Sequence, residues 1–272
     1  MKSWFKKLAT YLPFKRQKAA NPSLNAEEES SEQQILWWGT FIIDEDQSRY
    51  FKIGNLVLCV DRFEHKWHIT TYHEGEKPFK TFAAQTSNEI RLQPTLPDRA
   101  LLSKLERSFY IPMGETLMLY ISSPIWIQIE AGHPPILLEE IATETLADTW
   151  FGKNTLEGEL CYAGITTCSP TLDDLPRDST RIITPILVEN RSHETLLLHE
   201  LKVPLPLLSV YSDAQNYLWT EQLNLFQADP ESMETVVVKG PPQGLKNIQL
   251  VNPARDSNKP GLKNLFSSFM WK

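Results

Sequence analysis

The sequence predicts an all-β protein built of packed antiparallel sheets of the β-sandwich type, with a short amphipathic helical segment at each end. The first observation behind this prediction is a series of short runs, rich in β-branched and aromatic residues, at near-regular spacing from Ile35 onward. The second is the lack of any long helical period between Ile35 and Leu250. The third is that 19 prolines outnumber 11 glycines, which favours proline-marked turns and sheet edges over glycine-rich phosphate loops.

The first predicted element is a basic amphipathic helix over residues 1–14, which Pro13 brings to its end. Its apolar run is too short for a secretory signal peptide, so we expect a retained segment. Residues 15–34 are polar and predict a disordered tether. The apolar face consists of Trp4, Phe5, Leu8, Tyr11 and Leu12, and Lys2, Lys6 and Lys7 lie off it.

Residues 35–98 are predicted to form an N-terminal β sub-domain. Gly54-Asn55 lies between two strand-like runs and is a two-residue hairpin signal. A second hairpin is expected around the turn from His73 to Glu76, and the prolines at 94 and 97 suggest a boundary. The predicted strands are Ile35–Ile43, Tyr50–Ile53, Leu56–Phe63, Trp67–Tyr72 and Pro78–Phe82.

Residues 99–250 are predicted to form a C-terminal β-sandwich that packs with the first sub-domain. One short helix is expected over residues 99–107. The remaining apolar runs are short and evenly spaced, which favours sandwiches or barrels over βαβ units. The predicted strands are Thr116–Ile121, Ile125–Glu130, Leu137–Thr143, Leu160–Thr166, Arg181–Val188, Thr195–Leu201, Leu207–Tyr211, Leu218–Phe226 and Glu234–Lys239.

Residues 251–272 are predicted to form a C-terminal amphipathic tail. Leu262, Leu265, Phe266 and Phe269 follow helical spacing, and Trp271 adds a large aromatic side chain near the end.

Composition sets further bounds. A chain of 272 residues is long enough to bury a core as one large or two modest domains. No run of about 18 apolar residues offers a membrane-spanning helix. The chain has only three cysteines, Cys59, Cys161 and Cys168, and this odd, low number argues against a disulfide framework and favours a reducing compartment. No two of them form a CxxC pair, which excludes a zinc ribbon. We therefore expect a cytoplasmic protein.

Charge is distributed unevenly along the chain. Residues 1–22 contain six basic side chains and no acidic one. Residues 251–272 contain four basic side chains and one acidic side chain. Residues 23–250 hold 17 basic and 33 acidic side chains, a net charge of -16. Because phosphates are bound by Lys and Arg, an acidic body argues against a nucleic acid as the partner.

Motifs that carry catalytic or metal chemistry are lacking. No Walker-type loop, GxGxxG, GxSxG or HExxH occurs. His65 and His68 would point to opposite faces of a strand, and His193 and His199 would lie about 20 Å apart. The sequence therefore predicts no catalytic residue, no metal site and no cofactor, and it favours a non-enzymatic protein.

Two aromatic clusters leave an alternative open. Trp37-Trp38 and Trp150-Phe151, with Tyr162, consist of large side chains that line either a ligand pocket or the hydrophobic core. A pocket would support a ligand-binding or hydrolytic β-domain instead of an interaction protein.

Six segments of the second half carry a resemblance to a known family. They are Thr149–Gly152, Gly158–Tyr162, Ile183–Ser192, Val203–Pro206, Leu208–Ser212 and Leu218–Thr220. These segments resemble the DUF432 family, a domain of unknown function found in archaea and some bacteria. The resemblance extends over roughly residues 36–245 and implies no catalytic residues. Some bacterial members are encoded beside small mechanosensitive channels, which implies a membrane protein as a partner.

The contrast between the basic ends and the acidic body gives the leading functional hypothesis. A short basic helix with Trp and Phe lies at a membrane interface, where each Lys adds about 1 kcal/mol near anionic lipid. We expect an accessory protein that attaches peripherally, through both ends, to the inner face of the plasma membrane or to a membrane protein. The alternative partner is a second copy of the chain, with the terminal segments docking on a neighbour in a homo-oligomer.

Overall fold

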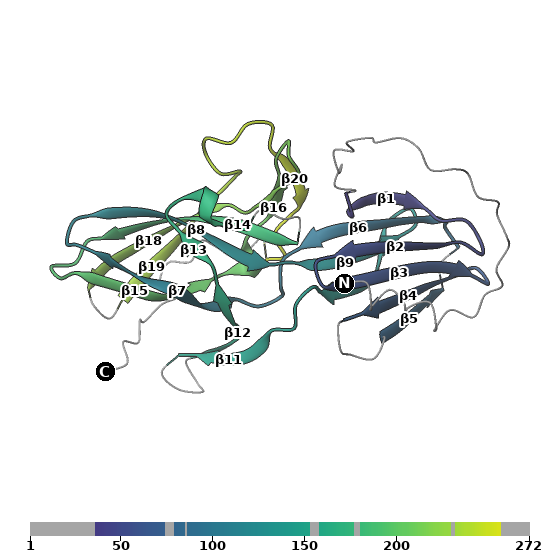
Figure 1. The fold of residues 1–272 in the computed structure, drawn as a ribbon, viewed down its shortest axis with the longest axis horizontal. Coiled ribbons are helices and arrows are strands. Elements are labelled where there is room, and N and C mark those ends of the chain that lie inside the picture. The colour runs from purple at the N-terminus through teal and green to yellow at the C-terminus, as the bar shows by residue number, and fades with distance from the viewer. Residues whose placement is uncertain are drawn as a thin grey trace, which may run out of the picture. The chain divides into compact units, whose positions relative to one another are not determined.

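The computed structural model describes residues 36–73, 79–84, 86–152, 158–176, 180–229 and 232–256 (Figure 1). The predicted helix over 1–14, the tether over 15–34 and the tail from residue 257 onward lie outside these ranges. Within them the chain is all-β, which confirms the all-β part of the predicted fold and leaves the terminal helices as predictions.

The described residues form twenty strands and two one-turn 3-10 segments, joined by turns and loops. In chain order they are β1 (Gly39–Ile42), β2 (Ser48–Ile53), β3 (Leu56–Phe63), β4 (Lys66–Tyr72), β5 (Phe79–Ala84), β6 (Glu89–Thr95), β7 (Leu101–Ile111), β8 (Thr116–Pro124), β9 (Trp126–Ala131), β10 (Ile136–Ala142), β11 (Ala147–Phe151), β12 (Glu159–Thr166), β13 (Cys168–Ser169), η1 (Leu172–Asp174), β14 (Arg181–Asn190), β15 (Leu196–Val203), η2 (Leu205–Leu207), β16 (Val210–Ser212), β17 (Leu218–Trp219), β18 (Gln222–Asp229), β19 (Ser232–Val238) and β20 (Gln249–Asn252).

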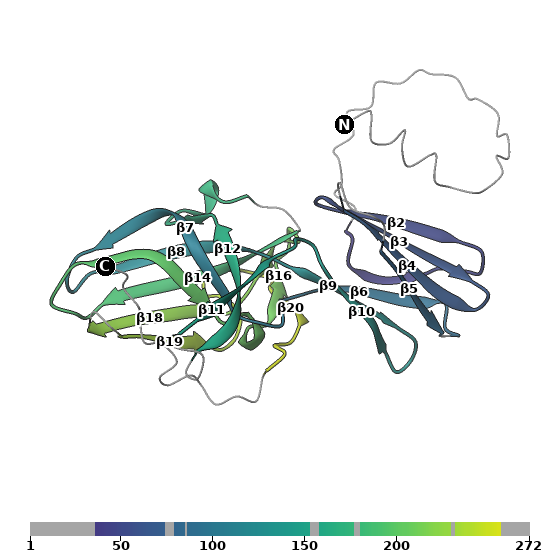
Figure 2. The same ribbon diagram turned by 90° about the horizontal axis from the view of Figure 1, so that it is seen from below.

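Two antiparallel sheets form the first sandwich. Sheet I has the order β1-β6-β9-β10, and sheet II has the order β2-β3-β4-β5 (Figure 2). The rings of Phe41 in β1 and Phe51 in β2 lie 4.9 Å apart between the sheets. At the edges, Thr81 Oγ1 in β5 donates to Glu139 Oε2 in β10 at 2.8 Å. Apolar packing inside and a hydrogen bond at the rim therefore join the two sheets.

The second sandwich combines sheet III, with the order β11-β12-β7-β15, and the eight-stranded sheet IV. Sheet IV has the order β13-β8-β14-β17-β16-β20, with β18 paired to β14 and β19 paired to β18. Most pairs are antiparallel, as predicted. Three are parallel, because β7 pairs with β12, and β14 pairs with both β17 and β18.

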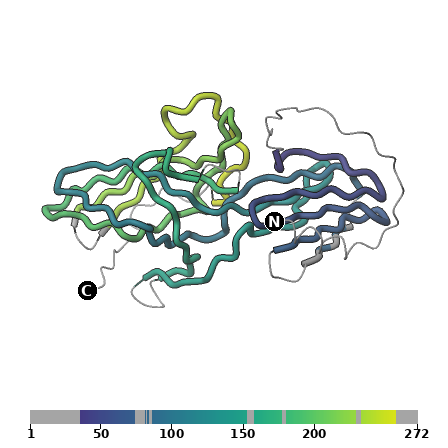
Figure 3. The backbone as a smooth tube through the Cα atoms, in the orientation of Figure 1, coloured from purple at the N-terminus to yellow at the C-terminus, as the bar shows by residue number. Residues whose placement is uncertain are grey.

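The chain passes between the sandwiches three times, as Figure 3 traces. It passes from β6 to β7, returns from β8 to β9, and leaves again from β10 to β11. Strand pairing therefore does not follow the predicted division at residue 98, since β9 and β10 belong to sheet I. One hydrophobic core cluster extends from Trp37 to Leu225 and includes residues of all four sheets.

The short helix expected over residues 99–107 is wrong. Residues 101–107 instead form the first part of β7, which pairs with β12 on one side and β15 on the other. The side chains of Leu101 and Ser103, both in β7, are fully buried. A segment with strands on both sides satisfies its backbone groups in the sheet, so tertiary pairing overrides its local helical spacing.

The turn residues in the sequence predicted the first hairpin correctly. The Gly54-Asn55 hairpin is confirmed, because Ile53 pairs with Leu56 and Gly54 has a φ of +58°. A second tight turn between β3 and β4 uses Glu64 and His65, both with positive φ values, 52° and 59°. Side-chain bonding compensates for this uncommon conformation, since the His65 backbone N–H donates to Glu45 Oε1 at 2.9 Å.

Candidate functional site

The predicted contact residues of the terminal segments lie outside the described part of the chain. They are Trp4, Phe5, Lys6, Lys7, Leu8, Tyr11, Leu12, Leu262, Leu265, Phe266, Phe269 and Trp271. Their role stays a prediction. Among the described residues, none forms a helix with the length and hydropathy that crossing a bilayer requires.

Trp37 and Trp38 lie in the hydrophobic core. Their exposed fractions are 3% and 8%, and their rings meet edge to face with centroids 5.2 Å apart. Both belong to the main core cluster together with Leu92 and Ile129 of sheet I. The structure therefore supports the interpretation of this pair as part of the hydrophobic core.

Trp150 occupies a different environment. It lies on the edge strand β11 and is 44% exposed. A Cβ atom built at Gly158 would lie 2.2 Å from Trp150 Nε1, so only glycine fits beneath the indole. The contact joins the edge strand β11 to the residue directly before β12.

Phe151 belongs to a small polar cluster on sheet III. Lys202 Nζ lies 4.8 Å from the centre of the Phe151 ring and forms an ion pair with Glu159. The Lys202 side chain is only 5% exposed, and Cys161 Sγ lies 3.6 Å from Glu159 Oε1. Burial, and secondarily the nearby Glu159 carboxylate, raises the pKa of the Cys161 thiol to about 11. The thiol therefore stays protonated at neutral pH and is a poor nucleophile.

Tyr162 connects sheet III to the crossing between β6 and β7. Its hydroxyl donates to Asp98 Oδ1 at 2.7 Å, and its ring centre lies 6.0 Å from that of Trp126. The Arg99 guanidinium lies 5.2 Å from the Tyr162 ring centre and is also bonded to Asp148 at 2.9 Å. Burial and the bond to Asp98 raise the pKa of Tyr162 to about 12. Tyr162 is thus part of the junction between the sandwiches.

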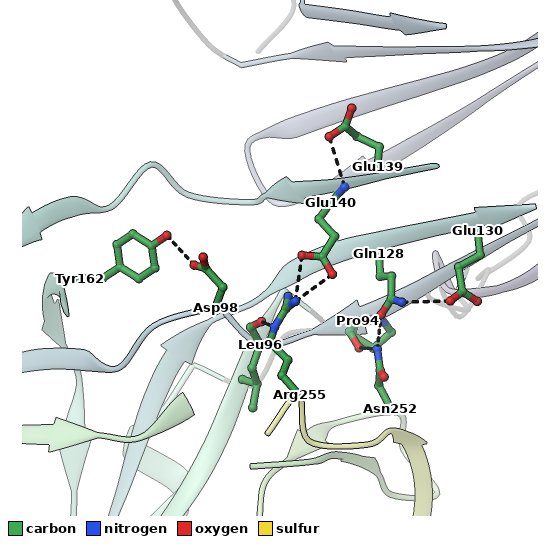
Figure 4. Close-up of polar contacts among 10 residues, drawn as sticks. All are labelled: Pro94, Leu96, Asp98, Gln128, Glu130, Glu139, Glu140, Tyr162, Asn252 and Arg255. Atoms are coloured by element: carbon green, nitrogen blue, oxygen red, sulfur yellow. Dashed lines mark hydrogen bonds and ion pairs between the residues drawn. The ribbon is translucent and has the colours of Figure 1, made fainter. Parts of the chain in front are cut away.

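Further long-range polar contacts lie at this junction (Figure 4). Arg255 donates from Nε to the Leu96 carbonyl at 2.8 Å and from Nη1 to Glu140 at 2.9 Å. Asn252 Nδ2 donates to Gln128 Oε1 at 2.7 Å. We call Asn252 and Arg255 the C-terminal clamp, because they fasten the end of β20 in sheet IV to β9 and β10 in sheet I.

Sequence reasoning missed the C-terminal clamp. It grouped residues 251–256 with the tail, whereas Val251 and Asn252 belong to β20. The clamp's partners lie 115 to 159 positions earlier in the chain, so no spacing rule connects them. In the sequence, the feature that could have indicated the clamp was Arg255, a basic residue shortly after the residues that form β20.

A buried carboxylate supports the same region from within sheet IV. Glu221 is 2% exposed and accepts hydrogen bonds from the Ser209 backbone N–H at 2.6 Å and the Ser209 hydroxyl at 2.9 Å. Ser209 Oγ in turn accepts from the Ala254 backbone N–H at 3.2 Å. Glu221 and Ser209 therefore position the residue between the two members of the clamp.

The outward face of sheet II carries exposed aromatic side chains. Tyr50 is 51% exposed and Phe63 is 46% exposed. The Phe63 ring meets His68 edge to face at 6.2 Å. We call this surface the aromatic face; its members on β2, β3 and β4 are Ser48, Tyr50, Lys52, Val57, Cys59, Asp61, Phe63, Lys66, His68, Thr70 and Tyr72.

No group of three or more potential metal ligands forms among the residues that the structure describes. His65 lies in the hairpin turn, where Nδ1 is 3.4 Å from Glu45, and His68 lies on β4. His193 and His199 are both exposed. The histidines that looked suggestive in sequence are therefore not brought together.

One comparison with known proteins identifies the family of the chain. A family model described as a protein of unknown function, DUF432, matches residues 37–271. The match confirms the resemblance and extends it past residue 245 into the C-terminal tail, while residues 1–36 lie outside it. No curated protein and no solved structure matches the chain significantly.

Proposed function

Because this chain belongs to the DUF432 family, whose function is unknown, we propose from its own residues that it is a non-enzymatic accessory protein attached peripherally to a membrane. The attachment is through the basic terminal segments, and the acidic β body is the part presented to the cytoplasm. A membrane protein, such as a channel of the small mechanosensitive type, is the alternative anchor.

The observation that carries the proposal is the C-terminal clamp. The predicted amphipathic tail begins near Pro260, only five positions after Arg255. Asn252 lies in β20 of the second sandwich, and Asn252 and Arg255 are bonded to the first sandwich through Gln128, Leu96 and Glu140. An anchor that starts so close to the clamp would hold the body directly and not through a long linker.

Charge supports the same proposal. Residues 1–22 hold six basic and no acidic side chains, whereas residues 23–250 carry a net charge of -16. Anionic lipid attracts the ends at about 1 kcal/mol per Lys and repels the body. Each segment alone is a weak anchor, but two on one molecule act together because binding of the first concentrates the second at the surface.

Vesicle flotation of the full-length protein tests the proposal. We expect the protein to float with vesicles rich in phosphatidylserine, to stay behind with pure phosphatidylcholine, and to be released by high salt. Full-length variants with Lys6→Glu and Lys7→Glu, or with Lys259→Glu and Lys263→Glu, should lose most of this binding.

The matched control places the same charge change on the body, at the exposed Lys239 and Lys246, and should leave flotation unchanged. A protein that stays soluble with anionic vesicles, and also fails to bind a reconstituted channel of the small mechanosensitive type, would contradict the proposal.

A further inference from the structure

Strand β12 begins before its parallel neighbour β7 does. Its residues Tyr162–Thr166 pair with β7, whereas the preceding residues Glu159–Cys161 pair with Thr149–Phe151 of the edge strand β11 (Figure 1). We call these two paired segments, Thr149–Phe151 and Glu159–Cys161, the overhang. The overhang is thus a two-stranded extension of sheet III.

Two large apolar side chains of the overhang lie on the core-facing side of the sheet. Leu160 is two positions before Tyr162 and shares its face, and Trp150 pairs with Leu160. Tyr162 belongs to the main core and is 9% exposed, whereas Leu160 is 43% exposed and Trp150 is 44% exposed. Because the apolar face of a sheet is stable when another element covers it, these two side chains indicate a docking surface.

The described chain ends close to the overhang. The Arg255 guanidinium lies 5.8 Å from the centre of the Trp126 ring, which lies 6.0 Å from the centre of the Tyr162 ring. Leu160 is two residues from Tyr162, or about 7 Å along β12. Arg255 therefore comes within about 25 Å of the overhang. Asp256, the next residue, is the last one that the structure describes.

The C-terminal tail has the length and the side-chain pattern to cover this surface. From Asp256 to Leu262 the chain can span about 20 Å when extended. A helix with apolar side chains at positions i, i+3, i+4 and i+7 binds through that face to an apolar surface. A helix of about three turns is marginal by itself, so it needs a surface on which to fold. The apolar positions of the tail that follow this pattern are Leu262, Leu265, Phe266 and Phe269.

The family match treats the two ends of the chain differently. It extends through residue 271 and includes the tail, whereas it begins at residue 37 and leaves out the N-terminal segment. The overhang and the tail therefore belong to the same family domain. This shared membership favours the tail of the same chain as the occupant of the overhang over an external partner.

We propose that the C-terminal tail packs on the overhang of its own chain, with the apolar side chains of residues 262–269 against Trp150 and Leu160. The docked tail is then withheld from lipid, so its binding to a membrane requires release from the overhang. This consequence rests on the proposed function, because the same tail is one of the two membrane anchors. The docking itself does not depend on that function.

Disulfide cross-linking of the full-length protein tests the docking. The double variant Leu160→Cys and Phe266→Cys should form an intramolecular disulfide under mild oxidation, which peptide mapping detects. The matched control combines Phe266→Cys with Ile165→Cys, because Ile165 lies on the same strand but on the opposite face and is 75% exposed. Docking raises the effective concentration of the tail at Leu160, so cross-linking there should be about tenfold faster than at Ile165.

The outcomes of this experiment are distinct. The native cysteines, Cys59, Cys161 and Cys168, are buried and do not compete. Equal rates at the two positions would show random collision, and a disulfide between two chains would show that the tail docks on a second copy. Either result overturns the proposal, as does a lack of cross-linking at Leu160.

Limited proteolysis of the full-length protein is a second measurement, without added cysteines. A docked tail protects the peptide bond after Lys263 from trypsin, and Trp150→Asp should increase cleavage there about fivefold because it releases the tail. Tyr110→Asp is the matched control, since Tyr110 is 72% exposed on β7 and lies outside the overhang, and it should leave cleavage unchanged. Equal cleavage of the wild type and Trp150→Asp, with both folded by circular dichroism, overturns the proposal.

Vesicle flotation separates this inference from the proposed function. If both are correct, Trp150→Asp should float at a lower phosphatidylserine content than the wild type. Cross-linking at Leu160 without flotation of any variant supports the docking and contradicts the proposed function. Flotation of the wild type without cross-linking at Leu160 supports the proposed function and contradicts the docking.

Discussion

Arg255 donates a hydrogen bond to Glu140 at 2.9 Å, although 115 positions separate the two residues along the chain. The contact joins the end of the last strand to β10 of the first sandwich. Together with the three chain crossings, this contact joins the two sandwiches at their junction. The predictions below test this junction and three other buried polar groups.

Removing the clamp should weaken the whole fold. Arg255→Ala removes the bonds to Glu140 and to the Leu96 carbonyl, and it leaves a partly buried carboxylate without its cation. We expect a loss of about 1–3 kcal/mol in the free energy of unfolding, measured in urea. Lys239→Ala, at an exposed position after β19, should change it by less than about 0.5 kcal/mol. Equal effects of the two variants would show that the clamp does not stabilise the junction.

Glu221→Gln should destabilise the protein despite its small change in size. Both Glu221 oxygens accept hydrogen bonds from Ser209, one from its backbone N–H and one from its hydroxyl. An amide nitrogen at either place would oppose a donor or lose a bond in a buried site, at a cost of about 1–3 kcal/mol. Thermal unfolding compares this variant with Glu115→Gln, which changes an exposed residue. A melting temperature equal to that of the wild type would contradict the role given to Glu221.

Two neighbouring serines should respond in opposite directions. Ser123 Oγ is buried and has no hydrogen-bond partner in the described structure, so Ser123→Ala should leave stability unchanged or raise it by about 1 kcal/mol. Ser122 Oγ accepts from Arg181 Nε at 2.8 Å, so Ser122→Ala should lower stability. The urea midpoints of the two variants, compared with that of the wild type, measure these effects. A lower midpoint for Ser123→Ala would contradict the prediction and reveal a hydrogen-bond partner for its hydroxyl.

Stability should fall at alkaline pH because of the buried thiols. Burial raises the pKa of Cys161 from 9.0 to about 11 and that of Cys168 from 9.0 to about 12. The folded state then holds protons that the unfolded chain releases, so the contribution is complete below pH 9 and is lost as pH rises through the folded values. Urea midpoints between pH 8 and 11 should fall less steeply for the double variant Cys161→Ala and Cys168→Ala; parallel curves would exclude the thiols as the cause.

Part of the fold was readable from local sequence. The Gly54-Asn55 hairpin and most strands were predicted, because turn residues and alternating burial are properties of a few neighbouring positions. The helix expected over residues 99–107 was wrong for the opposite reason. The position of β7 between β12 and β15 depends on strands far along the chain, which local sequence does not reveal. The aromatic pair Trp37-Trp38 could not be assigned to core or pocket until its packing was known.

The sequence by itself determined the all-β class, the family, and the contrast between basic ends and an acidic body, because composition and short-range periodicity carry these properties. Only the tertiary structure decided that β9 and β10 return to the first sandwich, and that Arg255 meets Glu140 and Leu96. It also decided which side chains of β3 point outward beside Tyr50 and Tyr72. The physical reason is that the register between strands brings together residues that no local spacing connects.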